Sequence, residues 1–428
     1  MQVVDEFRGY DEMKSSFLPW IVCFAATLFF FFEFIQGNMF ASIAANIMQD
    51  FHIQADKMAY LSSIYYLANV LFLFIAGMVL DRFSIKNTIL IAMSLCVAST
   101  FLLAYSHSFY VAMFCRFVTG IGSAFCFLGP VRLASHWFPP KRMALVTGAI
   151  VTMAMTGGML AQYPLTKLVA YVGWRQAVLD VGILGFTMLI VMIFWIRERP
   201  KVPVKKTGKP IAVFSAAKLA YFNPQYLRAA LYTSLMNMAI AVFGAMMGTL
   251  YLEQRLGIST EQASMVNGML FFGAIVGAPL VGWLSDKMNL RILPMKIGVL
   301  ASLMTLLAVL YLPVSLNMMM VLFFLLGFFT SAQVISYALV AESSSPMMTA
   351  TAVSVISILT QGGYLVYQNV FSRLLVGHGG VHFIGGVPIY SLGAYQHAAL
   401  ILPAGLFIAL LLLFGLKETH CRQVESSI

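Results

Sequence analysis

The stretch "GMVLDRFSIK", Gly77 to Lys86, closes a long apolar run with an acid and then bases. The stretch "GWLSDKMNLR", Gly282 to Arg291, repeats this pattern in the second half of the chain. The residues that align without a gap are Gly77, Asp81, Arg82 and Lys86 with Gly282, Asp286, Lys287 and Arg291. A motif that repeats without a gap at equivalent places in the two halves indicates an internal duplication.

Composition places the chain in a membrane. Of its 428 residues, 61% are apolar and 10% are charged, whereas a soluble domain has about 45–50% and about 25%. The first sixteen residues are polar and of mixed charge, unlike a cleavable signal peptide, so the first hydrophobic run is expected to remain as an anchor. The five cysteines are an odd number, and four fall within apolar runs, which argues against a disulfide framework.

The apolar runs are long enough to be helices that span a bilayer, since a span needs roughly 20 residues. They are too long and too continuous for the alternating strands of a membrane barrel. The predicted spans are residues 17–40, 58–80, 88–106, 110–133, 143–165, 175–196, 229–251, 262–284, 292–312, 316–340, 348–370 and 395–416. The expected fold class is an all-α membrane protein with twelve spans.

Orientation follows from the basic residues of the short loops. With the N-terminus inside, most of the 26 basic residues lie on the cytoplasmic side, and an even number of spans returns the C-terminus there. The net charge of +10 is then a topology signal, and no nucleic-acid partner is expected. The chain contains no Asn-x-Ser/Thr acceptor, which favours a bacterial inner membrane.

A polar linker divides the chain into equal halves. It contains "RERPKVPVKKTGKP", Arg197 to Pro210, a composition typical of a solvated segment. The predicted organisation is an N-terminal six-helix bundle (1–196), a cytoplasmic linker (197–228) and a C-terminal six-helix bundle (229–428). Parallel six-span repeats related by an axis along the membrane normal are a transporter architecture.

The Gly-x-x-x-Asp-Arg pattern between spans two and three resembles the signature of the major facilitator superfamily (MFS). This resemblance implies two pseudo-symmetric bundles that rock about a midplane site. It also implies that the aspartate caps a neighbouring helix and pairs with bases across the two halves, latching the cytoplasmic side. The implied gate residues are Gly77, Asp81, Arg82, Lys86, Gly282, Asp286, Lys287 and Arg291, and Arg132 near the cytoplasmic end of span four is added to them. The alternative is that these bases serve topology alone.

Two further stretches support this resemblance, and two departures from the family's pattern count against parts of it. Ser84 and Ile85 stand where the family favours glycine and a base. "RFVTGIG" from Arg116 resembles the motif of the fourth span. Gly148 and Gly157 have the spacing of the drug-antiporter motif, but Gln162 stands where its proline should be, so drug efflux loses support. The stretches "FFFEFIQGNMFASIAANIMQDF" and Gly129 to Gly148 resemble phagosomal nutrient carriers of intracellular bacteria, which import amino acids or nucleosides.

Glu33 and Arg116 are the candidate residues for substrate binding and proton coupling. Charges inside a bilayer are costly and usually face a cavity with a partner. The rise of 1.5 Å per residue places both side chains about 10 Å below the outer surface, so they could pair. An anion that engages Arg116 would then free Glu33 to bind a proton. The alternative is a permanent structural ion pair.

Uncharged polar side chains in the spans indicate the remaining cavity surface. Each of them could equally be a hydrogen bond between helices. The candidates are Gln36, Asn38, Asn237, Gln333, Tyr337, Gln361 and Tyr364. Gln333 and Tyr337 have the i, i+4 spacing of one helical face.

The sequence therefore favours a secondary transporter of a small polar metabolite, an amino acid or short peptide above all, with protons as a coupling partner. An organic-anion or siderophore carrier and an uncoupled uniporter are the alternatives, and a transport-dead sensor or membrane enzyme is the least favoured. No cofactor is expected, because no phosphate loop or nucleotide motif is present. His378 and His382 have no nearby acid or thiol to complete a metal site. A monomer is expected.

Overall fold

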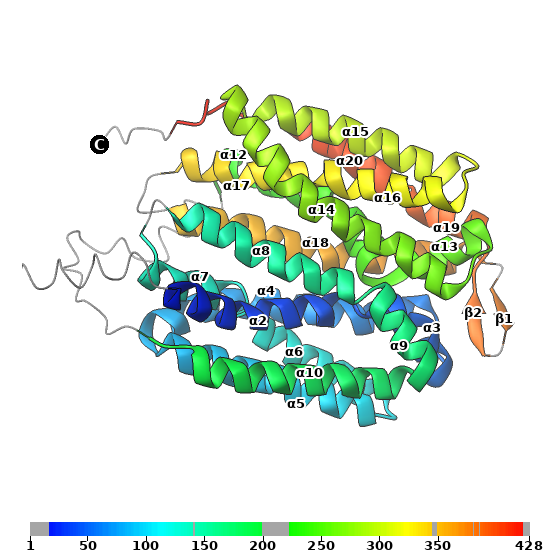
Figure 1. Ribbon diagram of the computed structural model, residues 1–428. Helices are drawn as coiled ribbons and strands as arrows, with labels where there is room; N and C mark the ends of the chain where they lie inside the picture. Colours follow the sequence, from blue (N-terminus) through cyan, green and yellow to red (C-terminus); the bar gives the residue numbers. More distant parts are fainter. Residues whose placement is uncertain are drawn as a thin grey trace, which may run out of the picture.

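The computed structural model describes residues 17–139, 142–198, 222–344, 349–379, 381–384 and 386–422. Most of the predicted linker lies outside these residues. The described chain is helical apart from loops and one short hairpin, and it forms two six-helix bundles (Figure 1). The predicted fold class is therefore confirmed, whereas the boundaries between domains stay a prediction.

The first bundle contains three spans that are interrupted rather than continuous. These spans are α2 with α3, α6 with α7, and α8 with α9. The bounds are α2 (Leu18–Asn38), α3 (Phe40–Asp50), α4 (Ala55–Arg82), α5 (Ile85–Tyr105), α6 (Phe109–Ser123), α7 (Leu128–Trp137), α8 (Met143–Leu160), α9 (Tyr163–Val172) and α10 (Trp174–Trp195).

The second bundle is interrupted in its first and fourth spans, like the first bundle, and also in its last span, whereas its fifth span, α18, is continuous; it also carries a hairpin. Its bounds are α12 (Pro224–Met236), the π-helix η3 (Ile240–Met247), α13 (Gly248–Leu256), α14 (Thr260–Met288), α15 (Ile292–Tyr311), α16 (Leu316–Thr330), the 3₁₀-helix η4 (Ser331–Val334), α17 (Ile335–Glu342), α18 (Thr349–Gly377), α19 (Leu392–Ala399) and α20 (Ile401–Leu413). Strands β1 (His382–Ile384) and β2 (Val387–Ile389) pair antiparallel, with His382 opposite Ile389.

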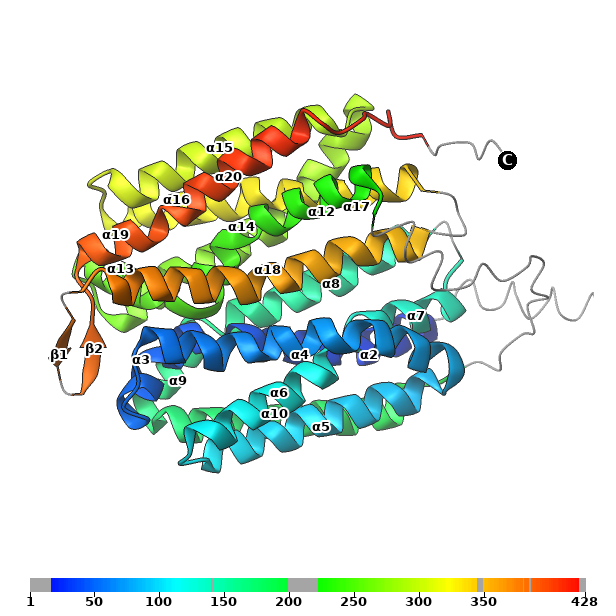
Figure 2. The ribbon, with the colours of Figure 1, turned by 180° about the vertical axis from the view of Figure 1, so that it is seen from behind.

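The helices run roughly parallel between two ends of the molecule. We call the end that holds residues 198, 222 and 422 the terminal end, and the opposite end, which holds the hairpin, the distal end. Figure 1 and its reverse view in Figure 2 both show the first bundle (blue to green) beside the second (green to red).

Local capping explains where several helices begin. Ser84 caps α5 by accepting from the backbone N–H of Asn87, and Ser259 with Gln262 forms a capping box on α14. Asn223 accepts from two backbone N–H groups of α12, and Pro224 occupies its first position. The seventh span therefore starts at Pro224, five residues before the position that hydropathy alone predicts.

Within the described residues, eleven helical segments are long and apolar enough to cross a membrane. Helix α18 is the remaining long helix, with 29 residues, and it carries the polar side chains Gln361, Gln368 and Asn369. It packs between α4 of the first bundle and α12 of the second (Figure 2). Its position and length make it the twelfth helix of the fold, and its polar residues suit a helix that faces other protein.

The two bundles contact each other through the distal halves of their helices. One seam joins α4 to α18, where Asn369 Nδ2 donates to Ser63 Oγ at 2.8 Å and Arg373 Nη2 donates to Tyr60 Oη at 2.9 Å. Beside it, the backbone N–H of Ala55 donates to Tyr390 Oη at 3.0 Å. The other seam joins α8 and α9 to α14, and α3 packs on η3 beside it. These contacts close the distal end.

The glycines of the repeated motif lie in open space. A Cβ added to Gly77 or Gly282 would meet no atom within 4 Å. No other helix therefore packs closely against these two glycines in this arrangement. By contrast, Gly158 in the distal half of α8 lies directly against the Phe271 ring of α14. The bundles are thus in closer contact at the distal end than at the motif glycines.

Candidate functional site

Arg116 is completely buried on α6 (0% exposed). Its guanidinium carbon lies 4.6 Å from the ring centroid of Phe40 and 4.6 Å from that of Tyr65, so the cation is stacked between two aromatic faces. Arg116 Nη1 donates to the Gln36 carbonyl at 3.0 Å. The two rings and one carbonyl therefore contact the cation, and its Nε and Nη2 donors have no hydrogen-bond partner among the described residues.

Glu33 on α2 is equally buried (1% exposed). Its Oε2 atom accepts a hydrogen bond from Tyr65 Oη at 3.1 Å, while Oε1 has no partner within the described chain. Among the described residues, no ion pair joins Glu33 to Arg116. The sequence predicted that these two charges could pair, but Tyr65 lies between them. Its hydroxyl donates to Glu33, and its ring stacks on Arg116.

Gln36 and Asn38 turn their amides toward their own bundle. Gln36 Nε2 donates to Thr100 Oγ1 on α5 at 2.9 Å. Asn38 Nδ2 donates to the Phe34 carbonyl one turn earlier, at 2.8 Å, and its Oδ1 is unpartnered among the described residues. The Gln36 bond is the helix-to-helix alternative that the sequence left open, whereas the Asn38 bond stays within α2. The role of the two residues in substrate binding stays a prediction.

The second bundle brings three of the predicted cavity residues together. Gln333 Nε2 donates to Asn237 Oδ1 at 3.0 Å, and Tyr364 Oη donates to the same oxygen at 3.4 Å. Asn237 Nδ2 in turn bonds Gln333 Oε1 and the Thr233 carbonyl. Asn237 and Gln333 lie where α12 and α16 are interrupted, so an amide pair links the two broken spans.

Tyr337 and Gln361 are half-buried on α17 and α18. The predicted i, i+4 face of Gln333 and Tyr337 does not form on a single α-helix, because Gln333 belongs to the 3₁₀ segment η4. Tyr337 packs against the hydrophobic core. Whether either side chain meets a substrate stays a prediction.

Tyr66 connects the polar clusters of the two bundles. Its hydroxyl donates to the Gly37 carbonyl at 3.1 Å, and its ring centroid lies 4.9 Å from that of Tyr364 on α18. Sequence reasoning missed Tyr65 and Tyr66. The signal was two adjacent tyrosines in the middle of an apolar span, in "SSIYYLAN". Hydroxyl groups at that depth need partners within the protein.

The first copy of the repeated motif contacts the end of α10. Lys86 Nζ donates to the Ile193 carbonyl at 2.9 Å, a favourable place for a cation because it is the C-terminal end of a helix. Arg82 and Arg132 are exposed at the terminal end. The side chain of Asp81 lies outside the described residues. The gating role of these residues stays a prediction.

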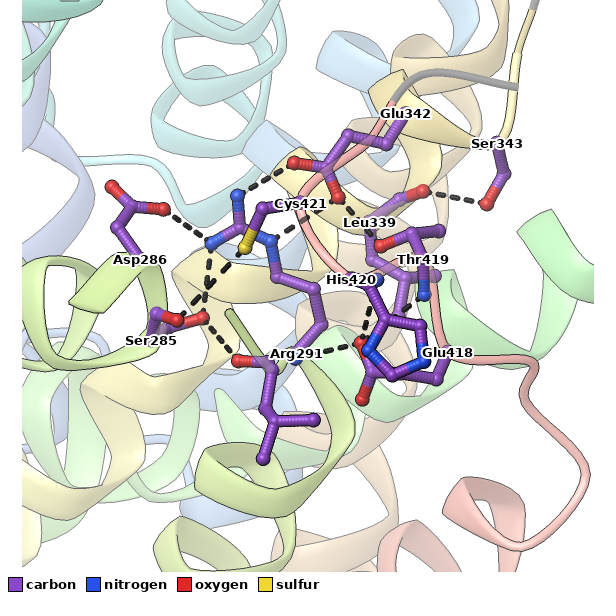
Figure 3. A network of polar contacts seen from close by, with 11 residues as sticks. Ser285, Asp286, Arg291, Leu339, Glu342, Ser343, Glu418, Thr419, His420 and Cys421 are labelled. Atoms are coloured by element: carbon purple, nitrogen blue, oxygen red, sulfur yellow. Dashed lines mark hydrogen bonds and ion pairs between the residues drawn. The ribbon is translucent and has the colours of Figure 1, made fainter. Parts of the chain in front are cut away.

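The second copy forms a charge cluster around Arg291 (Figure 3). Its guanidinium contacts Asp286 Oδ1 at 2.6 Å, Glu342 Oε1 at 2.6 Å and Ser285 Oγ at 2.9 Å. All of these partners lie in the second bundle, whereas the resemblance implies pairing across the bundles. Lys287 instead lies over the Trp283 ring of its own helix, 5.0 Å from the centroid.

An acid that follows the last helix of each bundle caps the helix after the motif. Glu198 Oε1 accepts from the backbone N–H of Lys86 at 2.9 Å. Glu418 accepts from the backbone N–H groups of Arg291 and Ile292, both at 2.8 Å. Sequence reasoning missed both acids. The signal is a base followed by glutamate just after the sixth and the twelfth span, "RE" and "KE".

The residues that follow α20 bind the Arg291 cluster through Glu418 and Thr419. Thr419 Oγ1 donates to Glu342 Oε2 at 2.6 Å, as Figure 3 shows. Burial alone would raise the pKa of Glu418, but the backbone N–H groups at the start of α15 and in the tail hold this pKa below its usual range. Glu418 is therefore an ionised cap that links the tail to α15.

The architecture defines a multi-pass integral membrane protein of two six-helix bundles. A family model described as Major Facilitator Superfamily matches residues 22–250 and 229–425. The chain belongs to the Major Facilitator Superfamily. This membership and the fold point to a transporter rather than an enzyme.

Relatives of the chain are transporters with varied substrates. The hexuronate transporter of Bacillus subtilis (strain 168) is 24% identical over 258 residues, which cover 57% of this chain and 59% of that protein. The lysosomal dipeptide transporter MFSD1 of Homo sapiens is 24% identical over 291 residues, 62% of this chain and 60% of that protein. The matches thus span about three fifths of these relatives. The narrower resemblance to phagosomal nutrient carriers stays a prediction.

Solved structures share the fold along nearly the whole chain. A bacterial homologue of the human lysosomal transporter Spinster, in an inward-facing and unoccupied conformation, superposes with a TM-score of 0.78. It is 18% identical and covers 94% of this chain and 97% of its own.

Replacing Glu418 with glutamine is expected to destabilise the protein at neutral pH. The pKa of Glu418 is lower in the folded than in the unfolded state, so its stabilisation is present above the unfolded value of about 4.3 and is lost as pH falls through the folded value. The difference in melting temperature between the wild type and Glu418→Gln should therefore shrink below about pH 4. Glu261→Gln, in the first turn of α14, is the control. A difference that stays constant with pH contradicts the ionised cap.

Proposed function

We propose that this protein is a secondary active transporter that moves a small carboxylate-bearing metabolite by alternating access, coupled to protons through Glu33. An amino acid or short peptide is the favoured substrate. The observation that carries the proposal is the buried cluster of Glu33, Tyr65 and Arg116, in which both charged groups keep hydrogen-bonding atoms unused among the described residues.

Arg116 is suited to bind a carboxylate. Its Nη1 atom is committed to Gln36, so Nε and Nη2 form the remaining edge of the planar guanidinium. Two parallel donors on one edge match the two oxygens of a carboxylate. Because Arg116 has no exposed surface, a substrate reaches this edge only when neighbouring side chains move.

Glu33 is suited to carry the coupled proton. Tyr65 Oη donates to its carboxylate, and the guanidinium of Arg116 lies over the face of the same ring. When a substrate carboxylate neutralises Arg116, the attraction that keeps Glu33 ionised weakens, so the site favours a proton at Glu33. Substrate and proton would then cross together.

The second bundle offers neutral partners for the rest of the substrate. Asn237 and Gln333 pair with each other, and Tyr364 joins them from α18. Tyr364 also contacts Tyr66 of the first bundle, so the two polar clusters face one another across the junction. An amino group or peptide amide between them could exchange hydrogen bonds with both bundles.

An organic anion is the second candidate substrate. The observation that favours it is the similarity to the hexuronate transporter of Bacillus subtilis (strain 168), a carrier named for an organic anion. In that case Arg116 alone would bind the ligand. Thermal-shift screening of the purified protein against amino acids, dipeptides and organic acids separates these two classes, and uptake without an imposed pH difference reveals an uncoupled carrier.

The terminal end is proposed to lie on the cytoplasmic side of a bacterial inner membrane, because loops rich in basic residues remain in the cytoplasm.

In a Cys421→Ser background, Lys57→Cys at the distal end should react with a membrane-impermeant maleimide in intact cells. Arg82→Cys should react only after the cells are permeabilised. The reverse pattern contradicts the proposed orientation.

Glu33→Gln is expected to abolish accumulation driven by a pH difference in proteoliposomes, because the neutral amide cannot bind and release a proton. Exchange of labelled for unlabelled substrate should persist. Arg116→Lys keeps the charge but loses the paired donors, and its KM should rise about tenfold or more. Arg255→Lys, remote from the cluster in the distal part of the second bundle, is the matched control. Full pH-driven accumulation by Glu33→Gln would remove Glu33 from the coupling mechanism.

A further inference from the structure

Gln162 lies at the junction of α8 and α9 and has no exposed surface. Its Nε2 atom donates to the Gly244 carbonyl of η3 at 2.9 Å, so a side chain of the first bundle bonds the backbone of the second. Its Oε1 atom accepts from Asn267 Nδ2 on α14 at 2.7 Å. Both ends of this one amide therefore cross between the bundles.

Asn267 completes the arrangement from the second bundle. It is also fully buried, and its Nδ2 atom donates to the Phe243 carbonyl at 3.0 Å. Gly248 leaves room for it, because a Cβ at that position would lie 2.5 Å from Asn267 Oδ1. The asparagine is thus held against η3 in the position that receives Gln162.

The target of Gln162 is an unusual helix. Residues 240–247 form a π-helix, and the backbone N–H of Gly248 bonds the Phe243 carbonyl five residues earlier. Short π-helical segments are uncommon and often lie at functional sites. Backbone carbonyls at membrane depth must find donors within the protein or in a water-filled space. The Gly244 carbonyl finds its donor in the opposite bundle.

We infer that Gln162 and Asn267 form the lock that holds the distal ends of the two bundles together and so sets how often the distal end opens. This inference rests on the alternating access proposed above. To open the distal end, α8 and α9 must separate from η3, which breaks both amide bonds. Water that enters the opening can then hydrate the released groups.

The lock differs from the polar contacts of the other distal seam. Asn369 is half-buried and Arg373 is exposed, so water competes with the bonds that they make to α4. Gln162 and Asn267 are both fully buried, where a lost partner leaves an unsatisfied polar group. Removal of Gln162 should therefore shift the balance more than removal of the α18 contacts.

The test measures the opening directly. Spin labels at Tyr171→Cys on α9 and Gln254→Cys on α13, in a Cys421→Ser background, report the distance between the distal ends by pulsed electron resonance without any substrate. Gln162→Leu should increase the long-distance, distal-open fraction roughly three- to tenfold, the range expected when two interhelical hydrogen bonds within a membrane are lost. Gln176→Leu, which removes a glutamine that bonds Asp180 on its own helix, is the control.

Rescue separates a lock from a general packing defect. Gln162→Asn alone should raise the distal-open fraction because the shorter amide cannot span the gap. Adding Asn267→Gln should return this fraction part of the way to the wild-type value, because the longer amide can remake the bond between the two side chains but not the bond to Gly244. An unchanged distribution in Gln162→Leu, or the same change in Gln176→Leu, overturns the inference. If Gln162→Leu does not fold, Gln162→Asn and its rescued partner decide the question. Because no solute is present, the result is independent of the proposed substrate and of proton coupling.

Discussion

A guanidinium buried in the membrane must be stabilised by the protein itself, and much of the first bundle is arranged around this constraint. Arg116 on α6 is held between the rings of Phe40 on α3 and Tyr65 on α4, so the three residues come from three different spans. Gly120, one turn after Arg116, allows α6 to approach α4, because a Cβ there would collide with the Tyr65 carbonyl. The cation therefore fixes how α3, α4 and α6 pack.

Interrupted helices supply the polar backbone that this site and the distal closure use. The carbonyls of Gln36 and Gly37, at the end of α2, accept from Arg116 and Tyr66. The carbonyl of Gly244, in the π-helix of the seventh span, accepts from Gln162. In a bilayer, irregular backbone is tolerated only where it is buried in protein or lines a cavity. The breaks thus coincide with the places where side chains of different helices or bundles meet.

The sequence predicts the architecture well because its signals are strong and repeated. Hydropathy gives the spans, and the ungapped echo of Asp81 in Asp286 gives the duplication. The breaks were not predicted, since η3 arises within an apolar run, "IAVFGAMM", that has no local signal for a π-helix. The starts of helices were also displaced where caps such as Asn223 override hydropathy.

The candidate site was predicted in its charges but not in its geometry. Glu33 and Arg116 stand out because charge is rare in the spans. The tyrosine between them was missed, because an aromatic residue in a membrane helix usually signals packing. Likewise, Glu198 and Glu418 lie far from the motif helices in sequence, so only the folded chain reveals that they cap the same helix of each bundle.

The central claim is that substrate and proton meet at the Glu33–Tyr65–Arg116 cluster. Calorimetric titration of the purified transporter with its substrate, repeated in buffers with different ionisation enthalpies, measures the protons that accompany binding. The account predicts that wild-type protein takes up protons as substrate binds and that this uptake disappears when Glu33 is replaced by glutamine. Binding heats that do not depend on the buffer in the wild type would contradict it.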